Sequence, residues 1–236
     1  MLARTREKPR GGTRAGGRDS LSNSAATVRA GSEGGGDGAA RVVVVGASAG
    51  GIEAFRALAG GLPPDLLAAV LVVVHIPATL PSLLPQILAS AGPLPAAHAQ
   101  DGETLRPGRI YVAPPDRHLL VEGGKVRLSA GPRENFSRPS VDPLFRSAAK
   151  SFGRRAAGVI LSGSLDDGAA GLAVVRRRGG LTVAQDPREA LFSSMPEGVI
   201  RRVGVDFVLP AADIAALLAS WASGKEMQEK RSVATV

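Results

Sequence analysis

The stretch Val42-Val-Val-Val-Gly46-Ala-Ser48-Ala-Gly50-Gly51 decides the fold of this chain. Its four consecutive valines predict a buried strand, because β-branched side chains favour the pleated conformation and lose rotamer freedom in a helix. A run without polar alternation is typical of a central parallel strand that is covered on both faces. The glycines after it predict a tight turn, and the segment from Ile52 predicts a helix.

The turn that contains Ser48 is compatible with three uses. Glycines before a helix N-terminus let an anion approach the free backbone N–H groups there. A serine on a sharp strand-to-helix turn can instead act as a nucleophile, with nearby N–H groups as an oxyanion hole. A purely structural turn is the third use. The stretch by itself leaves all three open.

The composition indicates one good-sized α/β domain without cysteine chemistry. Of the 236 residues, 44% are hydrophobic and only 3% are aromatic, so aliphatic side chains have to fill the core. The absence of cysteine excludes disulfides, thiolate metal sites and cysteine nucleophiles, and it fits a cytoplasmic protein. The longest apolar run, Leu66 to Val74, is shorter than the roughly 20 residues that cross a bilayer, so we expect no membrane insertion.

The net charge of +8 raises the question of an anionic partner. The basic residues are spread along the chain rather than gathered in one block, and no segment resembles a reading helix or an aromatic stacking platform. We therefore expect no specific binding of nucleic acid.

The two ends of the chain differ in composition from its middle. Residues 1–40 are rich in Gly, Ser, Ala and Arg and nearly lack large apolar side chains. Such a segment buries too little surface to offset its chain entropy, so we expect a disordered tail. One folded domain is expected over residues 41–222, followed by a polar tail over residues 223–236.

Strand and helix patterns alternate through that domain. Further strands are expected at 66–74, 109–113, 156–161, 181–184 and 205–209, and helices at 81–90, 144–152, after Gly168 up to Arg178, from Met195, and at 211–221. Residues 118–121 and 125–128 flank Glu122-Gly-Gly124, which predicts a hairpin. The alternation predicts an α/β fold, a doubly wound and mostly parallel sheet with helices on both faces, together with a small β-hairpin.

Polar side chains follow three of the predicted parallel strands. Ser48 follows one strand, His75 ends the next, and the pair Asp166-Asp167 follows a third. Sites in such sheets form at the carboxyl ends of the strands, so we expect these side chains to meet at one edge. A serine nucleophile needs a base to take its proton, and the base needs a carboxylate to orient it.

His75 is the best candidate for the base among the three histidines. It ends a strong strand beside a strand-breaking proline, whereas His98 ends a weak strand and His118 opens the predicted hairpin. One aspartate of the pair Asp166-Asp167 is expected to orient His75 and the other to cap the following helix. The resulting order Ser, His, Asp differs from that of α/β-hydrolases, but triads are recognised by geometry and role.

Several motifs together resemble the catalytic domain of the CheB family of chemotaxis-receptor methylesterases, over about residues 42–218. The matching segments are Gly46-Ala-Ser48-Ala-Gly50-Gly51, Val74-His75-Ile-Pro77, Gly108-Arg-Ile-Tyr-Val-Ala-Pro114 with Asp116-Arg-His118-Leu, Pro139-Ser-Val-Asp142-Pro-Leu-Phe145, Leu161-Ser-Gly163 with Asp167-Gly-Ala-Ala-Gly-Leu172, and Gly179-Gly-Leu-Thr-Val-Ala-Gln-Asp186 followed by Met195-Pro196.

The resemblance implies an activity and the residues that carry it. The family hydrolyses γ-methyl esters of glutamate on the cytoplasmic helices of chemoreceptors, and many members also deamidate glutamine. By position, Ser48 matches the nucleophile, His75 the base and Asp167 the orienting acid, which leaves Asp166 as a neighbour or a cap. No metal or cofactor is implied, and the oligomeric state is left open.

The chain departs from the family pattern in two places. Ser164 and Leu165 stand where family members usually carry methionine and glycine near the oxyanion site, and Ala49 stands where threonine is common. Many members also carry a phosphorylatable receiver domain before the catalytic one. Residues 1–40 show no such βα pattern, so control by phosphorylation in cis is not expected. The polar loop with Arg133, Asn135 and Arg138 has two readings, contact with an acidic receptor helix or, as is more usual for exposed basic residues, a solvated surface.

Two other classes of function compete with a methylesterase. A nucleotide- or phosphate-binding module would use the same glycine-rich turn, but Glu53 and Ala54 stand where a P-loop requires Lys and Ser or Thr. A catalytically silent scaffold would keep the fold for partner binding. An esterase of the same family that acts on a methylated protein outside chemotaxis is a third reading, within the same chemistry.

Overall fold

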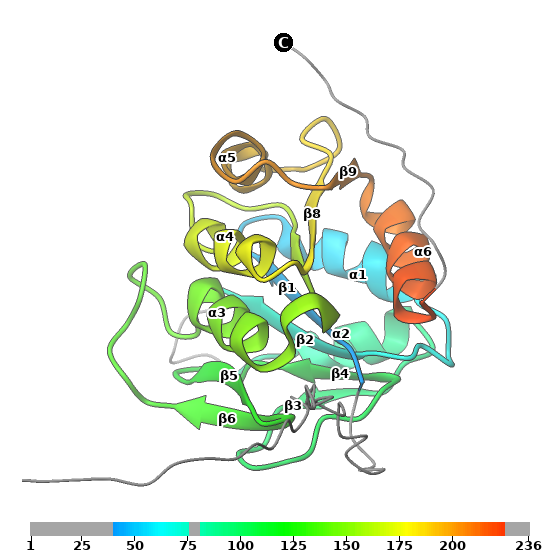
Figure 1. Ribbon diagram of the computed structural model, residues 1–236, viewed down its shortest axis with the longest axis vertical. Coiled ribbons are helices and arrows are strands. Elements are labelled where there is room, and N and C mark those ends of the chain that lie inside the picture. Colours follow the sequence, from blue (N-terminus) through cyan, green and yellow to red (C-terminus); the bar gives the residue numbers. More distant parts are fainter. Residues whose placement is uncertain (1–39, 76–80, 225–236) are drawn as a thin grey trace, which may run out of the picture. The chain divides into compact units, whose positions relative to one another are not determined.

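A computed structural model describes residues 40–75 and 81–224 of the chain (Figure 1). The tail predicted over residues 1–40 lies outside this range except for its last residue. Most of the C-terminal tail predicted over residues 223–236, and the proline predicted to end the second strand, also lie outside it.

The described chain forms one parallel sheet, a hairpin and six α-helices. The sheet has seven strands in the order β3-β4-β2-β1-β7-β8-β9, and every neighbouring pair is parallel. Its strands are β1 (Val42–Ala47), β2 (Ala69–Val74), β3 (Ala96–His98), β4 (Arg109–Val112), β7 (Ala156–Ile160), β8 (Leu181–Gln185) and β9 (Phe207–Leu209). The helices are α1 (Gly51–Gly61), α2 (Leu84–Ala91), α3 (Val141–Phe152), α4 (Ala169–Arg177), α5 (Ser194–Arg202) and α6 (Ala211–Ala222).

The valine run forms the central strand β1, as the sequence predicts. All four valine side chains are fully buried. Val43 and Val45 belong to one hydrophobic cluster and Val42 and Val44 to another, one on each face of the sheet. A strand whose side chains are buried on both faces of the sheet has no polar face, which explains why the run shows no alternation of apolar and polar residues.

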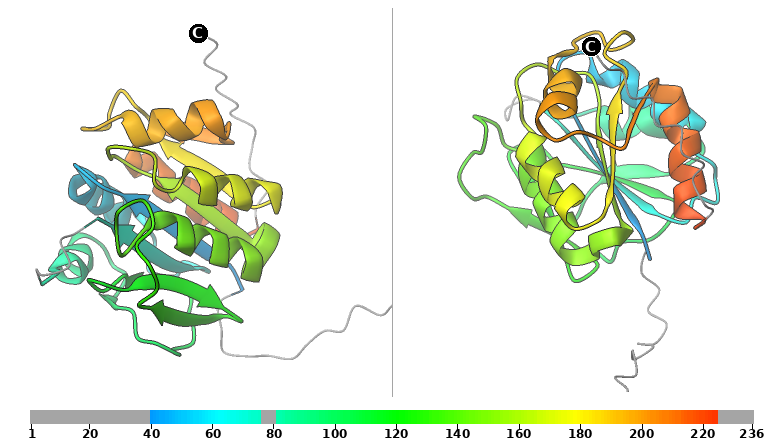
Figure 2. Two further views of the ribbon diagram at one scale, coloured as in Figure 1. Left: turned by 90° about the vertical axis from the view of Figure 1, so that its left-hand side faces the viewer. Right: turned by 45° about the horizontal axis from the view of Figure 1, so that its top comes forward.

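Helices cover both faces of the sheet, so the predicted doubly wound fold is confirmed (Figure 2). The cluster on one face contains residues of α1, α2 and α6, and the cluster on the other contains residues of α3, α4 and α5. From β1 the chain first builds outward through β2 and β4, and then returns to add β7, β8 and β9 on the other side. The strand order therefore reverses beside β1, and such a switch point opens a crevice at the carboxyl ends of the strands.

The predicted hairpin consists of β5 (His118–Glu122) and β6 (Lys125–Ser129), which pair antiparallel and pack on α3. Gly123 and Gly124 adopt φ values of 55° and 77°, as a two-residue hairpin turn with both central residues at positive φ requires. No helix within residues 40–75 and 81–224 is long and apolar enough to span a membrane.

Three elements begin later than predicted, and one of them is β9, which starts at Phe207 rather than at residue 205. The second strand starts at Ala69 rather than at residue 66, because the segment before it forms a turn in which the N–H of Leu66 bonds the carbonyl of Pro63. The helix predicted from residue 81 starts at Leu84, with Pro85 in its first turn. Proline tolerates that position because its missing N–H would have no partner there.

Candidate active site

Ser48, His75 and Asp167 meet at the carboxyl edge of the sheet, beside the switch point. Ser48 comes one residue after β1, His75 directly after β2, and Asp167 in the loop between β7 and α4. Nδ1 of His75 lies 3.1 Å from Oγ of Ser48, and Nε2 of His75 lies 2.7 Å from Oδ2 of Asp167. The three residues predicted from the sequence thus form one chain of hydrogen bonds.

Close packing fixes the turn that presents Ser48. The N–H of Ser48 donates to the carbonyl of Ser162, and the carbonyl of Ser48 accepts from the N–H of Gly51. Gly50 has a φ of 68°, which favours glycine. A Cβ on Gly50 would lie 2.9 Å from Cβ of Leu191, so a side chain from a distant loop already covers the turn. This packing disfavours the anion-binding use of the glycines, which needs an open approach to the N–H groups.

The carboxylate of Asp167 caps the N-terminus of α3. Its Oδ2 accepts from the N–H of Val141 at 2.7 Å, and its Oδ1 accepts from the N–H of Asp142 at 3.1 Å. The hydroxyl of Ser140, the residue that precedes the helix, donates to the same carboxylate at 2.9 Å and makes no capping bond to its own helix. Free N–H groups and the positive end of the helix dipole stabilise a negative charge at this position.

These donors hold Asp167 in its ionised form. Burial by itself raises the pKa of this carboxyl, since a charge is costly in a poorly solvated site. The hydrogen bonds from His75 and from the two backbone N–H groups outweigh burial, so the pKa of Asp167 falls below its ordinary value of 3.8. An ionised carboxylate here is suited to fix the tautomer of His75 and to stabilise its cation.

A second buried carboxylate, Asp142, lies beside the first. The side-chain amide of Asn135 donates to Oδ1 of Asp167 at 2.6 Å and to Oδ2 of Asp142 at 2.9 Å. Oδ1 of Asp142 also accepts from the N–H of Gly171 at 2.6 Å. Burial, together with the charge of Asp167, raises the pKa of Asp142 above 3.8 despite these bonds. Sequence reasoning placed Asn135 on a surface loop and missed this inward role.

Asp166, the neighbour of Asp167, points elsewhere. Its carboxylate accepts from Nη1 of Arg202 at 2.6 Å, and both side chains are exposed. The N-cap of α4 is Gly168, which carries no side-chain hydrogen bond. The prediction that one aspartate of the pair caps the following helix is therefore wrong. The aspartate that caps a helix is Asp167, and the helix is α3.

Two of the three polar side chains singled out in the loop before α3 make bonds within the protein. The guanidinium of Arg138 donates to Oδ1 of Asp116 at 2.6 Å and to the carbonyls of Ala130 and Gly131. Asn135 is engaged with the two buried carboxylates. Both side chains hold the loop in place, and only Arg133 of the three has no such bond within the described residues.

The other two histidines lie apart from the triad. Nε2 of His98 donates to the carbonyl of Ser82 at 3.2 Å, and Nε2 of His118 donates to the carbonyl of Pro132 at 2.9 Å. Both therefore serve the packing of loops. Within the described part of the chain, no group of three His, Asp or Glu side chains is arranged to hold a metal ion.

The loop after β7 forms the wall beside Ser48. The N–H of Gly163 donates to the carbonyl of Phe192, and the carbonyl of Gly163 accepts from the N–H of Met195. A Cβ on Gly163 would lie 2.1 Å from Sδ of Met195 and 3.0 Å from Cβ of Ser48. Leu165 has a φ of 69°, so this chain keeps a left-handed backbone at the position where the resembling family usually has glycine.

Comparisons with known proteins identify the family of this chain. The model of the CheB methylesterase family matches residues 43–218. Protein-glutamate methylesterase/protein-glutamine glutaminase 2 of Anaeromyxobacter dehalogenans is 44% identical over 73% of this chain and 51% of its own length. A putative protein-glutamate methylesterase/protein-glutamine glutaminase of Leptospira interrogans is 40% identical over 74% of this chain and 91% of its own length.

A solved structure matches as well. The Thermotoga maritima CheB methylesterase catalytic domain superposes with a TM-score of 0.73 at 34% identity, over 77% of this chain and 98% of that domain. The chain spans about half the length of the first curated relatives it matches, at 51% for both the Anaeromyxobacter protein and a Geobacter metallireducens relative. With the family model matched across the folded region, the chain belongs to the CheB methylesterase family.

Proposed function

We propose that this chain is a serine hydrolase that removes methyl esters from glutamate side chains of chemotaxis receptors. The observation that carries the proposal is the hydrogen-bonded chain from Ser48 through His75 to the carboxylate of Asp167. Membership of the CheB methylesterase family and the printed names of the relatives support the same substrate.

The mechanism follows from the two hydrogen bonds of His75. Nε2 carries a proton and donates a hydrogen bond to the ionised carboxylate of Asp167, which leaves the lone pair of Nδ1 facing the hydroxyl of Ser48. Nδ1 takes the proton as Oγ of Ser48 attacks the ester carbonyl, and Asp167 stabilises the imidazolium. The proton then goes to the departing methoxy group, which leaves as methanol. Water attacks the acyl-enzyme by the same route and regenerates Ser48.

Backbone N–H groups next to Ser48 are proposed to bind the oxyanion. Within the described residues, the N–H groups of Ala49 and Ser164 make no hydrogen bond, whereas the N–H of Gly163 is bound to Phe192. A backbone donor depends little on the side chain that it carries. The replacement of methionine and glycine by Ser164 and Leu165 is therefore compatible with turnover, which favours an enzyme over a silent scaffold.

The same site supports deamidation of glutamine as a second activity. An amide forms the same acyl-enzyme, with ammonia in place of methanol as the leaving group, and the relatives' names include protein-glutamine glutaminase. His75 would supply the proton that the departing nitrogen needs. Release of ammonia from unmodified receptors measures this activity. The substrate helices are cytoplasmic in chemoreceptors, so the proposal places the chain in the cytoplasm.

The decisive experiment is methanol release from methyl-labelled chemoreceptor membranes by the native chain and by Ser48→Ala. We expect release by the native chain and a loss of about 10⁴-fold or more in the variant, with an unchanged circular dichroism spectrum. Retained turnover in Ser48→Ala would refute the proposed nucleophile. If neither protein releases methanol, labelling of Ser48 by a fluorophosphonate separates an esterase with another methylated substrate from a silent scaffold.

A further inference from the structure

Large apolar side chains are exposed mainly at the edge of the sheet that holds the triad. Within the described residues, seven large hydrophobic side chains are exposed. Five of them belong to segments that follow the carboxyl ends of the parallel strands, namely Ile52, Leu83, Leu165, Leu191 and Phe192. A sixth, Phe136, lies in the loop between β6 and α3, next to Asn135, which binds Asp167. The seventh, Leu67, precedes β2 and so lies at the opposite edge. Exposed large apolar side chains that gather at one edge of a molecule mark a binding site more often than scattered ones do.

Four of these residues, Phe136, Leu165, Leu191 and Phe192, belong to loops that contain a triad residue or pack beside one, and we call them the apolar rim. Phe136 follows Asn135, whose amide reaches Asp167. Leu165 comes two residues before Asp167, and Leu191 packs over Gly50 beside Ser48. The N–H of Phe192 donates to Oγ of Ser162 at 3.0 Å, and the carbonyl of Ser162 accepts from the N–H of Ser48.

Two side chains of the apolar rim are held outward on unfavourable backbone. Phe136 has a φ of 61° and Leu165 has a φ of 69°, values that bulky residues rarely adopt. Phe136 is 96% exposed and Leu165 is 71% exposed. Neither side chain gains packing in return, so the folded chain alone provides no reason for a large apolar residue at these positions.

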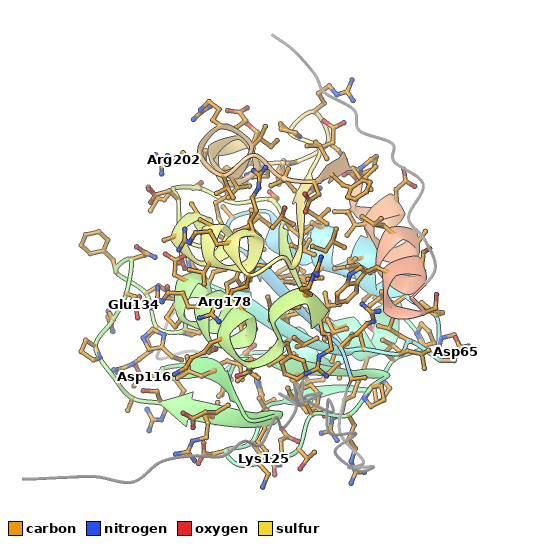
Figure 3. All side chains as sticks on the ribbon, viewed as in Figure 1. Asp65, Asp116, Lys125, Glu134, Arg178 and Arg202 are labelled. Atoms are coloured by element: carbon orange, nitrogen blue, oxygen red, sulfur yellow. The ribbon has the colours of Figure 1, made fainter. Side chains whose placement is uncertain are left out.

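Three arginines near the apolar rim are paired with carboxylates, whereas Arg133, in the loop that carries Phe136, makes no such bond within the described residues. Arg202 binds Asp166 at 2.6 Å, Arg146 binds Glu134 at 2.7 Å, and Arg188 binds Asp186 at 2.6 Å. Glu134 and Arg202 lie on the same side of the molecule, where Figure 3 labels them. These pairs match one another's charge and so leave apolar contact as a main source of recognition at this surface, with the ion pairs and Arg133 as its polar border.

We propose that the apolar rim docks a helix of the methylated substrate protein through apolar side chains one turn before and one turn after the ester-bearing glutamate. The inference rests on the proposed function and specifies how that site selects its substrate. On a helix, residues three and four positions from the glutamate share its face. A helix that extends its glutamyl ester toward Ser48 therefore presents these neighbours to the segments around the triad.

The experiment compares two substrates and uses asparagine substitutions. Asparagine tolerates the left-handed region, so Phe136→Asn and Leu165→Asn remove the apolar group while keeping the backbone. Leu67→Asn is the matched control, since Leu67 is 57% exposed at the opposite edge. For each variant, kcat/KM is measured on methyl-labelled chemoreceptor membranes and on the small soluble ester p-nitrophenyl acetate.

In the double variant Phe136→Asn/Leu165→Asn, we expect the ratio of kcat/KM for the receptor to kcat/KM for the small ester to fall about tenfold. The fall should lie mainly in the KM for the receptor. The control Leu67→Asn should keep the native ratio within about twofold, as expected for an exposed residue away from the interface.

Each other outcome overturns the inference in a distinguishable way. An unchanged ratio, with methanol release by the native chain, removes the docking role and leaves the proposed function standing. If the native chain hydrolyses only the small ester, both the docking role and the proposed function are refuted. A native dimer in size-exclusion chromatography that the double variant disperses would show that the apolar rim joins two copies of this chain instead.

Discussion

Nδ2 of Asn135 lies 2.6 Å from Oδ1 of Asp167 and gives the orienting carboxylate a side-chain donor from outside helix α3. The other hydrogen of the same amide is donated to Asp142, so one side chain separates two buried carboxylates. The arrangement explains how two acids lie close together in a poorly solvated site. It also makes the stability of the protein depend on pH in a predictable direction.

The change Asn135→Ala should cost more stability at neutral than at acidic pH. The folded-state pKa of Asp142 is raised above 3.8, so its contribution to stability is greatest below that pH and is lost as pH rises through the raised pKa. Removing the amide increases the repulsion between the ionised carboxylates. We expect a loss of about 1–3 kcal/mol in the free energy of unfolding near pH 8 and a smaller loss near pH 4. Urea unfolding at both pH values measures the free energy of unfolding. Equal losses at the two pH values would contradict the prediction.

The neighbouring aspartates offer a matched pair of substitutions. Asp167→Asn replaces a carboxylate that accepts backbone N–H groups and orients His75, so we expect kcat to fall on the order of 10³-fold. Asp166→Asn breaks only the exposed ion pair with Arg202, and kcat should stay within about twofold of native with a stability change below about 0.5 kcal/mol. Steady-state kinetics of the two variants tests whether turnover depends on Asp167 and not on Asp166. Equal losses would show that the pair shares the role.

Leu165→Gly should stabilise the protein. Leu165 is mostly exposed and adopts a φ of 69°, so the substitution loses little packing and removes a steric penalty of about 1–2 kcal/mol. The greater freedom of glycine in the unfolded chain offsets about half of that gain. A rise in Tm of about 2–4 °C is expected, and calorimetry measures it. A lower Tm would mean that the leucine side chain packs in solution.

Two glycines should respond to alanine in opposite ways. A Cβ on Gly163 would lie 2.1 Å from Sδ of Met195 and 3.0 Å from Cβ of Ser48, so Gly163→Ala should destabilise the fold by about 1–3 kcal/mol and reduce kcat by displacing the nucleophile. A Cβ on Gly198, inside α5, meets nothing within 4 Å. Gly198→Ala should therefore stabilise the fold by about 0.5–1 kcal/mol. Thermal unfolding of both variants tests the contrast.

The local features of the fold could be predicted from the sequence because short-range physics determines them. The valine run, the glycine turn after it and the Gly123-Gly124 hairpin each depend on neighbouring residues. The meeting of Ser48 and His75 required one further rule, that parallel strands end at the same edge of a sheet.

The remaining features of the site depend on contacts between distant segments. Whether Asp166 or Asp167 faces His75 is decided by the start of α3, which supplies two N–H groups to Asp167 alone. The role of Asn135 had only a weak signal, since asparagine tolerates the φ of 50° that it adopts. No local pattern indicates that its amide points inward.

The two halves of the triad come from opposite sides of the hairpin. Ser48 and His75 precede the turn at Gly123-Gly124, whereas Asp167 and the helix start that it caps follow it. A Cβ at either glycine of this turn would meet nothing within 4 Å, although the carbonyl of Gly124 accepts from the N–H of Leu105. Opening the chain between the two glycines would divide it into two fragments. Each fragment would carry an incomplete triad and one part of the sheet. Under the proposed function, hydrolysis would then report on the reassembly of the two fragments.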